Sequence, residues 1–125
     1  MKMGSVYDKM TDTEKEVAYY LEEKGLWWKF EFPVFVYDNK DRPRVWTPDF
    51  FIPKLGLFVE VCGSEDYNYE FRRKICDKNG IPVVFLHYYK RPKHWKAHLK
   101  KRIEKIQEKR SAEAKKLEDS TNTKK

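Results

Sequence analysis

The segments VWTPDFFIP (residues 45–53) and LGLFVEVCG (residues 55–63) determine the architecture, because each places one carboxylate within an apolar, β-favouring run. Burial of a charged group is unfavourable unless the group is paired or binds a cation. Asp49 and Glu60 would repel each other on neighbouring strands, and a divalent metal between them would remove this repulsion. The two segments therefore predict a site for Mg²⁺ or Mn²⁺ between two strands.

The strand pattern also predicts which way the second carboxylate points. Side chains alternate along a strand, so Glu60 and Cys62 are expected on one face and Val59 and Val61 on the other. Pro48 lacks an N–H group for a ladder hydrogen bond, which favours an edge position or a bulge at this point. Such a bulge can direct a side chain toward a site.

The rest of the chain predicts alternating helices and strands. A helix is expected over residues 11–25, where Glu14 completes a capping box and faces the core. The alternating run LWWKFEFPVFVY (residues 26–37) predicts a strand, and a second helix over residues 67–79 precedes the apolar strand IPVVFLH (residues 81–87). Strand, helix and strand in this order favour a parallel pair, so an α/β fold with a mixed sheet flanked by helices is expected.

Helical phase selects one arginine of the second helix. Phe71, Ile75 and Cys76 form its expected buried stripe, and Asn68 and Arg72 share that stripe. Arg72 is the only basic residue on this inward face. The two polar side chains are therefore expected near Glu60 and Cys62, and local capping or pairing is the simpler alternative.

These motifs resemble the PD-(D/E)XK nuclease superfamily, whose signature is Pro-Asp on one strand and Glu-x-Lys on the next. Pro48-Asp49 and Glu60-Val61-Cys62 stand at the two motif positions. The resemblance covers residues 11–90 and implies a restriction-endonuclease-like core with the order α-β-β-β-α-β. It also implies that Asp49, Glu60 and the backbone carbonyl of Val61 bind the metal, with support from Glu14.

The resemblance departs at one catalytic position. Cys62 stands where the superfamily carries a lysine that orients or deprotonates the attacking water. A buried thiol supplies neither positive charge nor a good base near neutral pH. Three alternatives stay open: Arg72 replaces the lysine cation, the metal acts alone, or the site has become a binding module. An arginine can hold a phosphate but cannot act as a base.

Charge divides the chain into two parts. Residues 91–125 contain 13 Lys or Arg and 5 Asp or Glu, a net charge of +8, whereas residues 1–90 carry −1. We expect a nuclease-like core domain over residues 1–90 and a basic C-terminal helix and tail over residues 91–125. A thin apolar stripe of the last helix ends at Ile106, and the tail beyond it is expected to be partly disordered. A basic arm suits a polyanion, although a solvated helix explains it as well.

Aromatic and basic residues near the motifs predict nucleic-acid contacts, with DNA favoured over RNA as the partner. Tyrosines can stack on unpaired bases, and arginines and lysines can bind phosphates. The residues expected to make these contacts are Tyr67, Asn68, Tyr69, Arg72, Arg42, Arg44, Lys96, Lys100, Lys101 and Arg102.

Length and composition restrict the classes of protein to which the chain can belong. A chain of 125 residues with 40% hydrophobic residues suits one compact domain. No apolar run approaches the roughly 18 residues of a membrane span. The N-terminal segment lacks the apolar stretch of a signal peptide, so a cytoplasmic protein without membrane contact is expected. Two cysteines do not form a disulfide framework, and reduced thiols are expected in that compartment.

The sequence thus predicts a Mg²⁺- or Mn²⁺-dependent endonuclease in which Asp49, Glu60, Arg72 and Cys62 occupy the catalytic positions. A catalytically inactive module that keeps the fold and binds nucleic acid or a protein partner is the alternative. A third hypothesis is a protein-interaction module whose last helix forms a homodimer. Convergence of Glu14 with Asp49 and Glu60 separates the first two, because a site without function has no physical reason to keep three acids together.

Overall fold

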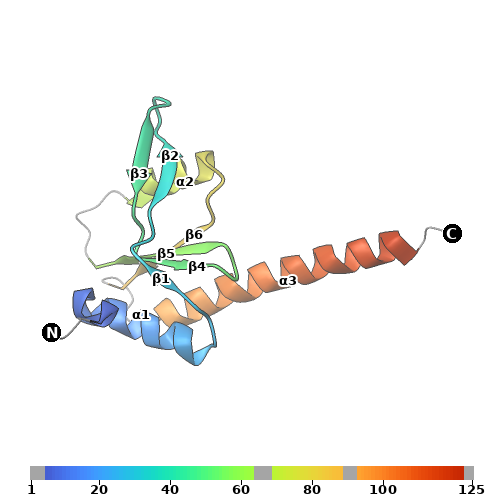
Figure 1. Ribbon diagram of the computed structural model, residues 1–125, viewed down its shortest axis with the longest axis horizontal. Coiled ribbons are helices and arrows are strands. Elements are labelled where there is room, and N and C mark those ends of the chain that lie inside the picture. The colour runs from blue at the N-terminus through green and yellow to red at the C-terminus, as the bar shows by residue number, and fades with distance from the viewer. Residues whose placement is uncertain (1–4, 64–68, 89–92, 123–125) are drawn as a thin grey trace.

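The computed structural model describes residues 5–63, 69–88 and 93–122. They form an α/β fold in which a four-stranded mixed sheet lies between helices, with a separate two-stranded hairpin (Figure 1). The elements are, in chain order, the 3₁₀-helix η1 (Val6–Lys9), α1 (Asp12–Glu23), β1 (Lys29–Phe30), β2 (Val34–Tyr37), β3 (Pro43–Trp46), β4 (Phe50–Ile52), β5 (Leu57–Cys62), α2 (Tyr69–Lys78), β6 (Val83–His87) and α3 (Trp95–Asn122).

The main sheet has the strand order β1-β4-β5-β6. β4 pairs antiparallel with both β1 and β5, whereas β5 and β6 are parallel, with Glu60 opposite Phe85. The expected mixed sheet and its parallel pair are therefore confirmed. α2 supplies the crossover that a parallel connection requires.

Helix α1 begins and ends where its sequence signals predict. The Thr11 side chain accepts from the Glu14 N–H at 3.2 Å, and the Glu14 carboxylate accepts from the Thr11 N–H at 2.8 Å. Gly25 follows the helix with a φ of +71°, a conformation that other residues adopt only with strain. The capping box thus fixes the Glu14 side chain at the first turn.

The expected single strand over residues 26–37 is wrong, because the structure divides it. Glu31 has a φ of +52°, and Pro33 cannot donate to a ladder, so the chain turns between β1 and β2. β1 joins the main sheet, whereas β2 pairs only with β3, in a hairpin that stands away from the sheet (Figure 1). The order α-β-β-β-α-β remains visible as α1, β1, β4, β5, α2 and β6, with the hairpin between β1 and β4.

The two faces of the main sheet are covered by different helices. The residues Leu57 and Val59 belong to the central core cluster together with Leu21 of α1 and Leu99 of α3. Phe58, Glu60 and Cys62 occupy the opposite face, where α2 lies, as strand alternation predicts.

Two expectations about the last two helices need correction. Phe71, expected in the buried stripe of α2, is 43% exposed. Burial on α2 is close to complete only at Cys76. The sequence also predicts a partly disordered tail beyond Ile106, whereas α3 in the structure is helical as far as Asn122. No Gly or Pro interrupts residues 93–122, and the Lys, Glu, Ala and Arg that dominate them favour helix even without packing.

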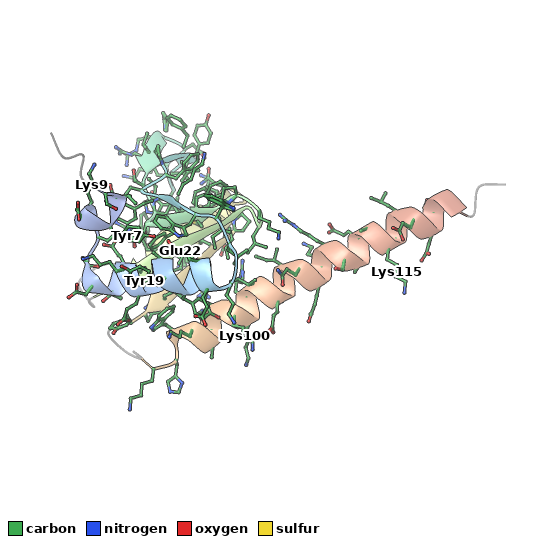
Figure 2. The ribbon with its side chains drawn as sticks, turned by 60° about the horizontal axis from the view of Figure 1, so that its bottom comes forward. Tyr7, Lys9, Tyr19, Glu22, Lys100 and Lys115 are labelled. Carbon is green, nitrogen blue, oxygen red and sulfur yellow. The ribbon has the colours of Figure 1, made fainter. Side chains whose placement is uncertain are left out.

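The far part of α3 projects beyond the sheet. Arg110 donates to the backbone carbonyls of Lys54 and Leu55, in the turn between β4 and β5, and this contact marks where the packed part ends. Lys115 lies on the projecting part, in solvent (Figure 2). No helix within the described ranges has the length and the apolar character that a membrane span needs.

Candidate active site

The sheet register brings the two motif carboxylates together. Phe50 pairs with Val59, so one step further along the antiparallel ladder Asp49 stands across from Glu60. The Glu60 side chain is buried, with only 7% of the residue exposed, and its hydrogen-bonding and charge effects raise the pKa of Asp49. Asp49 and Glu60 therefore approach each other, as expected for carboxylates on neighbouring strands.

Pro48 leaves the Val61 carbonyl without its ladder partner. The Val61 N–H donates to Oδ2 of Asp49 at 2.7 Å, so the backbone groups of this residue face the β4 side. The register would place Pro48 opposite Val61, and proline has no N–H to donate. The Val61 carbonyl thus receives no hydrogen bond from Pro48.

Glu14 joins this pair from α1. One of its carboxylate oxygens accepts the Thr11 N–H in the capping box, and the neighbouring Asp49 raises the pKa of the same carboxyl group. Glu14, Asp49 and Glu60 therefore form a chain of three carboxyl groups from α1, the segment before β4, and β5. We call these three residues the carboxylate site.

Titration of the carboxylate site reflects burial and mutual proximity. Burial, followed by the hydrogen bond and charge of Glu60, raises the pKa of Asp49 from 3.8 to about 7. Burial also raises the pKa of Glu14, and the Asp49 carboxyl raises it further. The pKa of Glu60 is raised by burial but lowered by Asp49, Arg72 and Trp46. Asp49 consequently keeps a proton to a much higher pH than a free aspartate does.

Two donors stabilise the charge of Glu60. Nη1 of Arg72 lies 3.3 Å from its Oε2 and forms an ion pair, so Arg72 points toward Glu60 as helical phase predicts. The indole Nε1 of Trp46 donates to the same oxygen at 3.2 Å. Sequence reasoning gave Trp46 no role here, because the contact joins β3 to β5 and no local pattern contains it.

Cys62 and Tyr69 lie on the α2 side of Glu60. Burial raises the pKa of the Cys62 thiol to about 12, and the neighbouring Glu60 charge adds to this shift. Burial and the adjacent Cys62 raise the pKa of Tyr69 well above its usual range, so its hydroxyl also keeps its proton. At neutral pH neither side chain can take a proton from a water molecule.

The hairpin arginines lie beside α2. Nε of Arg42 and Nε of Arg44 donate to Oδ2 of Asp38 at 3.0 and 3.1 Å, and the Asp38 side chain is almost fully buried. The Lys40 and Arg42 N–H groups donate to Oδ1 of Asp38, and these bonds keep its pKa well below the usual range. Sequence reasoning missed Asp38, because its partners depend on the hairpin turn.

The remaining predicted nucleic-acid contacts do not gather at the carboxylate site. Tyr67 and Asn68 lie outside the described residues. The α3 residues belong to the helix that covers the other face of the sheet, where Lys96 lies 6.0 Å above the ring of Tyr20. The α3 residues concerned are Lys96, Lys100, Lys101 and Arg102.

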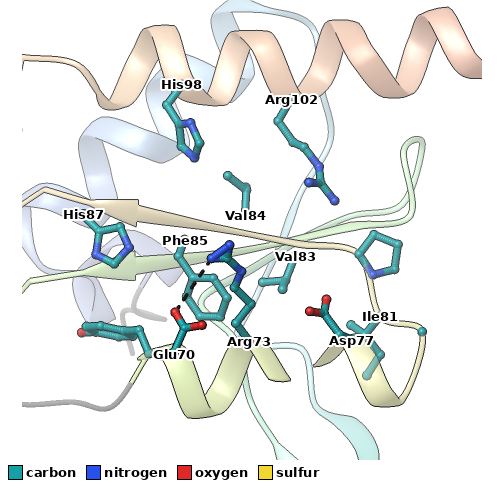
Figure 3. A pocket seen from close by; sticks show the side chains of 13 residues that line it. Glu70, Arg73, Asp77, Ile81, Val83, Val84, Phe85, His87, His98 and Arg102 are labelled. Carbon is teal, nitrogen blue, oxygen red and sulfur yellow. Dashed lines mark ion pairs between the residues drawn. The ribbon is translucent and has the colours of Figure 1, made fainter. Parts of the chain in front are cut away.

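A large cleft also lies apart from the carboxylates. It has a volume of about 830 Å³ and follows β6 between α2 and α3. Figure 3 shows His98 and Arg102 of α3 directed toward it from one side, and the ion pair of Arg73 with Glu70 on the other. Asp49 and Glu60 do not line this β6 cleft, so volume alone would mark the wrong place for the predicted chemistry.

The carboxylate site does not have the geometry of a formed metal centre. Across residues 5–63, 69–88 and 93–122, no three His, Cys, Asp or Glu side chains are spaced to hold a metal ion. Burial and the neighbouring carboxyl groups instead favour the protonated forms of these acids. A cation would replace those protons, and the hard oxygen donors present are of the type that Mg²⁺ and Mn²⁺ prefer.

Comparisons with known proteins do not assign a family. No protein-family model matches the chain, and neither a curated protein sequence nor a solved structure matches it.

Proposed function

We propose that this chain is a metal-dependent endonuclease that hydrolyses phosphodiester bonds of nucleic acid, with DNA as the first candidate. The observation that carries the proposal is the meeting of Glu14, Asp49 and Glu60 from three separate segments. Ionised acids close to one another repel, and a bound cation would relieve that repulsion. The element order is compatible with a restriction-endonuclease-like core that carries the hairpin as an insertion.

The metal would be bound by Asp49, Glu60 and the Val61 carbonyl, with Glu14 in support. These donors fit Mg²⁺ or Mn²⁺, since all are oxygen atoms and the carboxylates are negatively charged once their protons leave. A metal of this kind, when bound, lowers the pKa of a water molecule and polarises a phosphate. Trp46 would orient Glu60 through its indole N–H.

Arg72 would bind the phosphate. In the structure its guanidinium neutralises Glu60, and 39% of its side chain is exposed. A cation on Glu60 would take over that neutralisation, and the arginine could then donate to phosphate oxygens. Arg72 thus replaces the charge of the missing lysine but not its action as a base.

The direct test is cleavage of supercoiled plasmid and of single-stranded DNA and RNA in Mg²⁺, Mn²⁺ or EDTA. We expect metal-dependent cleavage by the wild-type chain and its loss in Asp49→Asn. Asp77→Asn is the matched control, because Asp77 is an exposed acid of α2 that lines the β6 cleft instead. Activity in EDTA, or equal activity of the two variants, would reject the proposal.

A nucleic-acid-binding module without catalysis is the second candidate, and two observations favour it. Cys62 is a neutral thiol at the position of the expected lysine, and Arg72 already neutralises Glu60 without a metal. Thermal unfolding with added Mn²⁺ separates the candidates, because a ligand that binds the folded state raises the melting temperature. A binding module would show nucleic-acid affinity but neither a Mn²⁺-dependent shift nor cleavage.

A further inference from the structure

A second, smaller cleft adjoins the carboxylate site. It has a volume of about 310 Å³ and lies between the hairpin and α2. We call it the hairpin cleft. Its lining combines two aromatic rings with three arginines, and these residues are Trp46, Phe71, Arg42, Arg44 and Arg72. A volume at the lower end of ligand pockets, with aromatic walls and cationic groups, suits a small, flat, anionic ligand.

Asp38 arranges two of these arginines in advance. Its Oδ2 accepts Nε of Arg42 and Nε of Arg44, so the terminal Nη groups of both arginines are not used in these bonds. Both side chains remain more than half exposed. Because Asp38 stays ionised, it holds the two guanidinium groups side by side against their mutual repulsion. Two guanidinium groups fixed in this way can donate to one phosphate group with little loss of entropy.

The hairpin is attached to α2 at the base of the hairpin cleft. The Asn79 side chain accepts from the Tyr37 N–H and donates to the Tyr37 carbonyl, both at 2.8 Å. Nζ of Lys78 donates to the Asp38 carbonyl at 2.7 Å. These hydrogen bonds join positions about forty residues apart in the sequence. They fix the distance between the hairpin and α2, which form the two walls of the hairpin cleft. The hairpin cleft is therefore formed before any ligand binds.

The opposite end of the hairpin cleft reaches the carboxylate site. Trp46 and Arg72 belong to its lining, and both also bond to Oε2 of Glu60. A ligand placed against these two side chains would thus lie next to the carboxylates. The β6 cleft has no such connection, because neither Trp46 nor Arg72 lines it.

We propose that the hairpin cleft binds one unpaired nucleotide adjacent to the phosphodiester bond that is cut. The base would stack on Trp46 and Phe71, and Arg42 and Arg44 would bind its phosphate. A base within an intact duplex is stacked and paired, so it cannot enter such a cleft unless it leaves the helix. This inference rests on the proposed function and assigns its substrate class, which is nucleic acid with an unpaired nucleotide at the cleavage position.

Binding measured in EDTA tests the inference without cleavage. Fluorescence anisotropy would compare the wild-type chain on a single-stranded DNA, a duplex with one unpaired nucleotide and a fully paired duplex of the same length. We expect about tenfold tighter binding to the two DNAs that have an unpaired nucleotide. Equal affinity for all three would overturn the inference.

Two variants assign the preference to the hairpin cleft. Phe71→Leu keeps an apolar side chain but removes the ring, and Arg42→Gln with Arg44→Gln removes the phosphate donors. We expect each to lower affinity for the unpaired DNAs several-fold while affinity for the paired duplex changes little. Phe35→Leu is the matched control for Phe71→Leu, since Phe35 is an 82% exposed aromatic residue of β2 that does not line the hairpin cleft.

The outcomes separate this inference from the proposed function. Preference for unpaired DNA in EDTA without any cleavage in Mg²⁺ would reject the nuclease but keep the nucleotide site. Cleavage in Mg²⁺ with equal binding of all DNAs would reject the nucleotide site alone. Equal losses on paired and unpaired DNA in the arginine variant would identify a general backbone contact and overturn the inference. Circular dichroism of each variant would verify that the fold is retained.

Discussion

The carboxylate site and helix α3 contain charged residues under opposite conditions. Glu60 is buried and each charge near it has a specific partner, whereas the lysines of α3 lie in solvent with weak pairs such as Lys100 with Glu104 at 4.0 Å. Exposed pairs of this kind contribute little to stability or specificity, while a buried carboxylate requires compensation. The excess positive charge of the sequence therefore lies on α3, whereas the charges that are unfavourable to bury lie at the carboxylate site.

Removal of the Asp49 carboxyl group should have the largest effect among the variants that compare the carboxylate site with α3. Asp49→Asn should lower metal-dependent cleavage about 100-fold or more, because it would remove a ligand of the proposed metal. Replacing Lys100 by Ala on α3 should leave the cleavage rate within about twofold. Single-turnover rates with saturating Mg²⁺ would measure both effects. Similar losses in the two variants would show that the carboxylate site has no special role.

The pH dependence of stability probes the buried charges directly. The pKa of Asp49 in the folded protein is about 7, above its value of 3.8 in the unfolded chain, so folding binds a proton between these pH values. This stabilisation is complete below about pH 4 and is lost as pH rises through 7, with a loss of roughly 2 kcal/mol between about pH 5 and pH 8. Urea unfolding in EDTA at these two pH values would measure it. Asp49→Asn should remove most of the difference, and an unchanged difference would contradict the shifted pKa.

Divalent cations should compete with the same proton. A metal that replaces the proton of Asp49 binds more weakly as pH falls below about 7, so the apparent Mn²⁺ affinity should rise with pH and level off above it. Isothermal titration calorimetry from about pH 5.5 to about pH 8.5 would measure this rise. A Mn²⁺ affinity that does not change over this range would place the metal elsewhere.

A comparison of Arg72 with its neighbour Arg73 on α2 should show a smaller effect on cleavage than the Asp49 variant. Arg72 pairs with buried Glu60 at 3.3 Å, whereas Arg73 pairs with exposed Glu70 at 3.9 Å. Arg72→Ala should lower cleavage about tenfold and raise the pKa of Glu60, because it leaves that carboxylate without its cation. Arg73→Ala should change neither by more than about twofold. Single-turnover cleavage and NMR titration of the Glu60 carboxyl would compare the two variants, and equal effects would contradict the assignment of Arg72.

The projecting end of α3 should have the smallest effect. Residues 111–125 contain four lysines and three acids, so the net charge of +8 lies almost entirely in residues 91–110. Truncation after Arg110 keeps its contacts with the turn between β4 and β5. The slope of log K against log salt should change by less than about one. A larger change would show that the projecting lysines bind phosphates directly.

The sequence predicted the carboxylate site better than its surroundings, and the reasons are physical. Strand alternation and helical phase depend only on local geometry, so the sequence alone is sufficient to place Glu60 and Arg72 on facing surfaces. The break at Glu31 could not be predicted, because its positive φ is imposed by the chain around it. The roles of Asp38 and Trp46 depend on contacts across the hairpin and the sheet, which a local pattern does not contain. The full length of α3 was missed because the prediction followed apolar packing and neglected helix propensity.

The hydrogen bond between the Trp46 indole and Glu60 allows tryptophan fluorescence to report on the carboxylate site. Indole emission depends on the charges close to the ring, and here the indole N–H donates to the carboxylate whose charge a cation would neutralise. Of the four tryptophans, Trp27 is 85% exposed, and Trp28 and Trp95 pack against the central core. With those three replaced by Phe, the emission of Trp46 alone would report, in real time and without any label, when Glu60 gains or loses its counterion.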